Sequence, residues 1–289
     1  MSEIVASHAT HTHTQRHARR TKSLGWTLLG IVITGLMLFP FYMILNYSLM
    51  HQTDILRYPP PIFPPQLTLD GYTRAMTTAG EYIRSSLIYG FGTVLITMLI
   101  ATPAAYSLAR VRYRIGLFLL FALILAQMAP GIVVANSLYA LFSHLHLISK
   151  YIAVILADST IAVPFAIIIM RAFMIGIPPE LAEAAVVDGA GHGRIFWSIV
   201  LPISRTAIIT AGLFSFLFGW GDFLFALILN NDPHHTPITV GIYRFIGAYS
   251  VEWPAVMATA LIAAIPAILL LAVAQRYVAA GITAGAVKE

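Results

Sequence analysis

Six stretches of about 20 residues, nearly free of charged side chains, constrain this chain more than any other feature of its sequence. The hydrocarbon core of a bilayer is about 30 Å thick, and a helix that rises about 1.5 Å per residue crosses it in roughly 20 residues. Because lipid offers no hydrogen bonds, each backbone N–H and C=O must be paired within its own stretch, so helices are predicted. The six predicted spans cover residues 24–45, 86–108, 115–138, 151–170, 208–229 and 254–273.

The composition agrees with a membrane protein and excludes several other classes. Of 289 residues, 58% are hydrophobic and 10% are charged, whereas soluble domains average about 25% charged residues. High apolar content, sparse charge and the absence of cysteine also exclude a disordered chain, a coiled coil and a disulfide framework. The net charge of +5 does not indicate nucleic-acid binding, because the basic residues are scattered between apolar runs. The lack of cysteine leaves the redox compartment open.

The distribution of lysine and arginine predicts the orientation of the spans. With the amino terminus inside, the predicted cytoplasmic segments 1–23, 109–114, 171–207 and 274–289 hold 12 of the 17 basic residues. Short cytoplasmic connections are enriched in basic residues, so both termini are predicted to be cytoplasmic. The first stretch is too long for a cleaved signal, which predicts a retained anchor.

Two external segments and one terminus carry further expectations. Residues 59–65 contain five prolines, which predict an extended strap after the first span. Residues 69–84 are polar and are predicted to form a short helix at the membrane surface, separate from the second span. The histidines among residues 1–23 have neither nearby acidic side chains nor a folded framework to hold a metal ion. This segment is therefore predicted to be a disordered cytoplasmic tail without a metal site.

The cytoplasmic segment 171–207 is too long for a simple turn. Pro179 and Glu180 are typical of a helix start, and Asp188 to Gly191 predict a break after this helix. A second short amphipathic helix is predicted to end at Leu201 and Pro202. The segment therefore presents small side chains and two acids, Glu183 and Asp188, to a partner protein. An amphipathic hairpin lying on the bilayer is the alternative, and the acids argue against it because lipid-surface helices usually carry basic faces.

This segment resembles the EAA loop of permease subunits of binding-protein-dependent ABC importers. Ten positions carry the resemblance: Glu183, Ala184, Ala185, Asp188, Gly189, Ala190, Phe196, Ile199, Leu201 and Pro202. The six spans, the Trp220 to Asp222 element and the segment from Gly281 to Lys288 are similar to the smaller permease subunit of carbohydrate importers of the maltose and trehalose kind. The resemblance implies an all-α polytopic membrane protein with the type I importer permease fold over residues 24–278, followed by a cytoplasmic tail over 279–289.

The family resemblance also implies a role for the loop and a set of partners. Residues 183–191 are expected to form the coupling helix that docks in an ATPase subunit, and Gly281, Thr283 and Gly285 to contact the ATPase dimer. The expected partners are a second homologous permease, two ATPase subunits, an external solute-binding protein and the bilayer of the bacterial inner membrane. The residues with an expected coupling role are Glu183, Ala184, Ala185, Asp188, Gly189, Ala190, Gly191, Leu201 and Pro202.

The chain is predicted to be a non-catalytic subunit. A P-loop needs a glycine directly before its lysine, and none of Lys22, Lys150 and Lys288 follows a glycine. We therefore expect no cofactor or metal here, with ATP and Mg²⁺ on the ATPase subunits.

Three residues inside the predicted spans are candidates for the translocation path. Asp158 and Asp222 are costly to insert into lipid and should face the protein interior or water, and Trp220 beside Asp222 could contact a sugar. Asp222 as a helix cap and Asp158 as an outer gate remain open alternatives. The sequence leaves the solute unidentified: interior acids favour a neutral or cationic solute, and glycerol phosphate or a polyamine is an alternative cargo. A proton-driven secondary transporter using both acids is a further alternative, although no internal repeat supports it.

Overall fold

The computed structural model describes residues 26–111, 113–247 and 251–286, and the regular secondary structure in this part of the chain is helical. Its only strand-like pairing is an isolated bridge between Ile246 and Val251. Residues 1–25, which include the predicted disordered tail, lie outside the described part. Four helices have the length and apolarity of a membrane span: Trp26–Ser48, Ala79–Arg110, Tyr151–Met174 and Trp253–Gln275.

Two pairs of bent helices bring the number of possible spans to six. In the first, α4 (Tyr113–Gln127) and α5 (Gly131–His144) meet at 89°. Pro130 precedes α5 and has no N–H for a continuous helix, so the predicted third span is interrupted there. In the second, residues 192–203 and α10 (Arg205–Gly221) meet at 77°.

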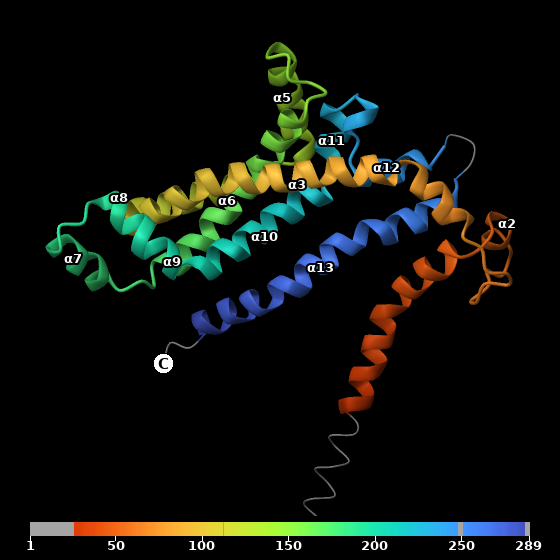
Figure 1. The fold of residues 1–289 in the computed structure, drawn as a ribbon, viewed down its shortest axis with the longest axis horizontal. Coiled ribbons are helices and arrows are strands. Elements are labelled where there is room, and N and C mark those ends of the chain that lie inside the picture. Colours follow the sequence, from red (N-terminus) through yellow and green to blue (C-terminus); the bar gives the residue numbers. More distant parts are fainter. Residues whose placement is uncertain (1–25, 112, 248–250, 287–289) are drawn as a thin grey trace, which may run out of the picture.

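The helix α3 (Asp70–Arg110) runs without a break for 41 residues. The prediction of a separate surface helix over residues 69–84 is therefore wrong. The polar segment contains no proline, and a helix needs no apolar residues to continue beyond the membrane, so the second span and this segment form one rod. The helices α6 (Tyr151–Met174), α10 and α13 (Trp253–Ala286) pack along α3 (Figure 1).

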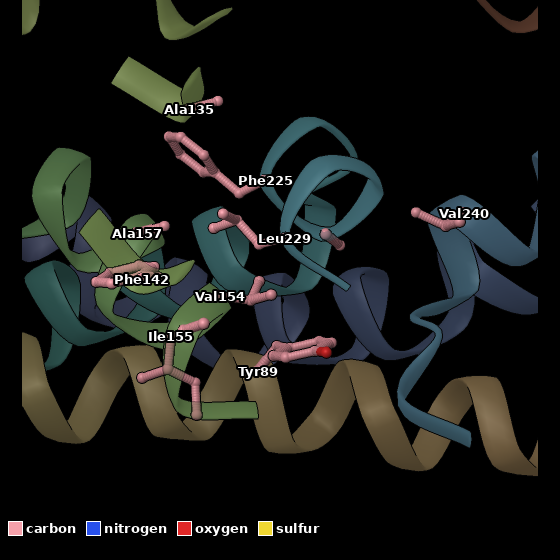
Figure 2. Close-up of a cluster of buried hydrophobic side chains, with 11 residues drawn as sticks. Tyr89, Ala135, Phe142, Val154, Ile155, Ala157, Phe225, Leu229 and Val240 are labelled. Carbon is pink, nitrogen blue, oxygen red and sulfur yellow. The ribbon is translucent and has the colours of Figure 1, made fainter. Parts of the chain in front are cut away.

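The fifth predicted span is also interrupted. Asp222 and Phe223 separate α10 from the short helix α11 (Leu224–Leu229). The helix α5, which follows the break at Pro130, and α11, which follows the break at Asp222, pack against each other beside the main bundle (Figure 1). Figure 2 shows Phe225 of α11 pointing toward Ala135 of α5, with Tyr89 of α3 below Val154 in the same buried cluster.

The bundle has two distinct ends. The helices α7 (Pro179–Val187), α8 (His192–Ile195) and α9 (Leu201–Ile203), with the π-helical segment η1 (Phe196–Val200), gather at what we call the loop end (Figure 1). The opposite end, called the strap end, carries the proline-rich strap and three short helices. These are α2 (Gln52–Ile55), η2 (Pro233–His235) and α12 (Ile238–Arg244).

The first helix, Trp26–Ser48, diverges from the bundle over most of its length (Figure 1). Residues 26–42 are exposed in the subunit by itself. The proline-rich strap is fastened to this helix, because Tyr42 Oη and Asn46 Nδ2 both donate to the carbonyl oxygen of Ile62 at 2.7 Å.

Candidate functional site: a projecting loop and an acidic pocket

The loop at the bundle end is a helix, a left-handed glycine turn and a second helix. Pro179 occupies the first turn of α7, and Glu180 lies at the helix start, where an acid favours the positive end of the helix dipole. Gly189 closes the helix with φ of 79°, a conformation that side chains other than glycine rarely adopt. The Ala190 amide donates to Ala185 O at 2.8 Å across this turn. The predicted break at residues 188–191 thus takes the form of a glycine C-cap.

The small residues of the loop are divided between two faces. Ala182, Ala185 and Ala190 are half-buried and pack against the apolar cluster at the loop end. Ala184 and Val187 face outward, and Val187 is 87% exposed. Of the coupling candidates, Glu183, Ala184, Asp188, Gly189, Gly191 and Pro202 are exposed, whereas Leu201 is half-buried.

An aromatic ladder fixes this loop to the end of α3. The guanidinium carbon of Arg110 lies 4.3 Å from the ring centroid of Tyr106, which lies 5.1 Å from the ring of Phe196 in η1. A cavity of about 410 Å³ separates α7 from the bundle, and Arg110 and Glu183 both line it. Sequence reasoning missed Tyr106 and Arg110, because nothing in a span's last turn marks it as an anchor for a loop about 90 residues later.

Inside the bundle, Asp158 and Asp222 line one pocket of about 380 Å³. Asp158, on α6, is only 3% exposed. Asp222 caps α11: its Oδ1 accepts from the Phe225 amide at 3.1 Å and its Oδ2 from the Ala226 amide at 2.7 Å. Thr239 Oγ1 donates to the carbonyl oxygen of Asp222, which ties the break to α12.

Trp220 lies two residues before Asp222 in sequence, but its side chain takes another direction. Its side chain is 5% exposed, its Nε1 donates to Ala263 O of α13 at 3.2 Å, and its ring stacks on Phe216 with centroids 5.7 Å apart. Trp220 is not among the described residues that line the acidic pocket. Its position is that of a packing residue between α10 and α13.

Ser149 connects the end of α11 to the segment that follows it at the strap end, a role that sequence reasoning missed. Its amide donates to Leu229 O at 2.9 Å, its hydroxyl accepts from the Asn231 amide at 3.0 Å, and its carbonyl lies 2.7 Å from His235 Nδ1. Tyr89 Oη donates to His235 O at 2.8 Å from the α3 side. The backbone of Ser149 has a positive φ of 65°, which no sequence pattern predicted.

Two expectations remain: the contact residues in the carboxyl-terminal tail, and the absence of a metal site. The backbone of α13 stays helical through Ala286, so Gly281, Thr283 and Gly285 continue that helix, while residues 287–289 lie outside the described part. In the described residues, no group of three or more His, Asp or Glu side chains is arranged to hold a metal ion.

The structure has membrane-length helices, a helical loop that projects at one end, and broken helices around one buried and one half-buried acid. Together these features define a membrane translocation protein. The chain belongs to the family of binding-protein-dependent transport system inner membrane components, whose sequence profile matches residues 98–284. It is therefore a translocation subunit of an ATP-driven importer.

Individual relatives agree with this assignment. The chain is 34% identical to a probable ABC transporter permease of Sinorhizobium fredii, over 94% of this chain and 98% of the relative. It is 32% identical to the trehalose transport system permease SugB of Mycobacterium tuberculosis, over 91% and 97%. Its fold matches a subunit of a bacterial ABC transporter involved in import of the acidic polysaccharide alginate, with a TM-score of 0.75, 21% identity and coverage of 90% and 96%.

Proposed function

We propose that this chain forms half of the translocation path for a sugar or sugar derivative. It works with a second related permease, two ATPase subunits and an external solute-binding protein in the bacterial inner membrane. The observation that carries the proposal is the projecting helix–glycine–helix loop on a bundle of membrane-length helices. The trehalose permease relative, matched over nearly its whole length, supports a sugar cargo.

The loop end is assigned to the cytoplasm. Arg110, Arg171, Arg194 and Arg205 all lie at helix ends or in the loop on that side, as expected for the cytoplasmic face. Both termini then lie in the cytoplasm. ATP and Mg²⁺ bind the ATPase subunits, and this chain takes part in no chemical step.

The outward face of α7 is the docking surface for an ATPase subunit. Ala184 and Gly189 let a partner approach the backbone closely, and a Cβ built at Gly189 meets no atom within 4 Å. Force applied there reaches α3 through Phe196 and Tyr106. The inward-facing Ala185 and Ala190 hold the loop on the bundle. Gly281, Thr283 and Gly285 on the last turns of α13 provide a second contact for the ATPases.

The acidic pocket is assigned to the cargo path. Irregular backbone at membrane depth is tolerated where it is buried in protein or lines a cavity, and transporters often place solute sites at broken helices. The break between α10 and α11 at Asp222 fits both conditions, because Gly221, Asp222 and Phe223 line the pocket. Asp158 faces the same space from α6, and Trp220 holds α10 in place against α13.

The test of coupling uses the complete importer in liposomes with its binding protein. Ala184→Arg places a long cation on the docking face and should abolish ATP-dependent uptake and loosen the ATPase subunits during purification. Ala184→Ser, which stays small, is the matched control and should transport normally. Undiminished uptake and ATPase retention with Ala184→Arg would show that α7 is not the docking helix.

A further inference from the structure

A second pocket, of about 370 Å³, opens on the side of the bundle near the loop end, away from the acidic pocket and the docking face. We call it the side pocket. Its floor is buried, since Leu108 and Ile167 are each 6% exposed, whereas Val111 and Leu119 at its rim are 37% and 41% exposed. The side pocket is lined by Ala104, Ser107, Leu108 and Val111 of α3, by Leu119, Ala122 and Leu123 of α4, and by Ile167 of α6.

The shape and lining of the side pocket suit a hydrocarbon chain. The helix α4 packs mainly on α6, and the small side chains of Ala104 and Ala122 leave the space between α3 and α4 unfilled. Every lining side chain except that of Ser107 is apolar. At about 1.5 Å per residue, the run from Ala104 to Val111 is roughly 10 Å long. In a membrane, the occupant that matches such a lining is part of a lipid acyl chain.

Two arginines lie where this pocket meets the loop end. Arg171 Nε donates to Leu108 O at 3.2 Å, and a Cβ built on Gly116 would lie 3.3 Å from Arg171 Nη2. The guanidinium is thus held between the end of α3 and the first turn of α4, where Arg114 is exposed. Capping the α3 carbonyls accounts for one N–H of Arg171, but it accounts neither for its other donors nor for Arg114.

The positive charge at this end of the side pocket has no counterpart in the described part of the chain. Neither Arg114 nor Arg171 forms an ion pair with a carboxylate there, and no acidic residue lines the pocket. The planar fork of donors on arginine suits phosphate oxygens. A zwitterionic headgroup would bring a cation to this basic site along with its phosphate, whereas phosphatidylglycerol carries a net negative charge. The charge therefore favours an anionic headgroup.

We propose that the side pocket binds an acyl chain of an anionic phospholipid whose phosphate is held by Arg171 and Arg114. The bound lipid joins the end of α3 to the start of α4. Basic pockets between membrane helices on the cytoplasmic side are typical sites for anionic headgroups. The assignment to the cytoplasmic leaflet rests on the proposed function, which places the loop end in the cytoplasm.

The test uses the complete importer in phosphatidylcholine vesicles that contain a minor fraction of phosphatidylglycerol with a photoreactive group on its acyl chain. After illumination, labelled peptides are identified by mass spectrometry. Label is expected on residues 104–111 and 119–123. Unlabelled phosphatidylglycerol should compete with the probe more than about 5-fold better than phosphatidylcholine with the same chains.

Two pairs of variants separate the chain from the headgroup. Ala122→Phe fills the side pocket and should abolish the label, whereas Ala126→Phe, one turn along α4 and outside the lining, should retain it. Arg114→Gln should weaken competition by phosphatidylglycerol about 5-fold, whereas Arg205→Gln, at another exposed arginine of the loop end, should leave it unchanged. Arg171→Gln should act like Arg114→Gln, and Arg114→Gln decides the matter if the Arg171 variant does not assemble.

Three outcomes would overturn the proposal. Equal competition by the two lipids would show ordinary bilayer contact, and label that persists in Ala122→Phe would place the lipid elsewhere. Absence of label in the wild type, with the second permease crosslinked to the pocket instead, would show a protein occupant. The probe is present in both leaflets, so the result does not depend on orientation. Sugar uptake in the same vesicles tests the proposed function separately, and its absence alongside specific labelling would overturn that function alone.

Discussion

Gly219 marks the closest approach between α10 and α3. A Cβ built on Gly219 would lie 2.8 Å from the backbone carbonyl oxygen of Tyr89 and 2.7 Å from Thr93 Oγ1. The threonine side chain can rotate, but the carbonyl belongs to the α3 backbone and cannot. Reaching an ordinary contact of 3.4 Å requires the helices to separate by about 0.6 Å. Gly219→Ala therefore overpacks the interface, which costs about 1–3 kcal/mol.

The matched control is Gly212→Ala, two turns earlier on the same helix. Its added Cβ would meet no atom closer than Val94 Cγ1 at 3.9 Å. Replacing glycine by alanine in a helix stabilises it by up to about 1 kcal/mol, so this variant should be at least as stable as the wild type. Subtracting its effect from that of Gly219→Ala isolates the overpacking. Thermal unfolding of both variants, assembled and in the same detergent, measures the difference. Equal midpoints for the two variants would refute the close contact between α3 and α10.

Three further changes test other parts of the structure. Gly189→Val must hold a φ of 79°, at a cost of about 1–2 kcal/mol, and should lower sugar-stimulated ATPase activity; unchanged activity would contradict the need for a left-handed turn. Gln52→Leu removes the bonds to Val251 O and the Trp253 amide, so hydrogen exchange at Trp253 should accelerate, and unchanged protection would contradict the clamp. Ser149→Ala removes the acceptor for the Asn231 amide, worth about 1 kcal/mol, and should increase proteolysis near Asn231; unchanged cleavage would contradict this connection.

Span positions could be predicted from the sequence because apolar length depends only on local composition. The two interruptions could not. Residues 208–229 are apolar on both sides of Asp222, and whether that carboxylate ends one helix or caps the next depends on α12 and α6 packing around it. The error over residues 69–84 has the opposite origin. The polar character of residues 69–84 predicted a separate helix, whereas in the structure this segment is the first part of α3.

The backbone geometry of the loop at residues 179–191 was largely predictable and the pocket was not. Gly189 and Pro179 determine local backbone geometry, which sequence spacing reports directly. Asp158 and Asp222 lie 64 residues apart, and only the packing of α6 against α10 brings them together. Trp220 and Asp222 were grouped because they lie close in sequence. Side chains two residues apart on a helix point about 160° apart, and here the indole turns toward α13.

The unbroken helix α3 has a mechanical consequence. At about 1.5 Å per residue, its 41 residues measure roughly 60 Å, about twice the hydrocarbon thickness. A tilt of about 10° around its middle swings each end through about 5 Å, in opposite directions. The two ends of the subunit are thus joined by one continuous helix, so a tilt imposed at one end displaces the other end as well.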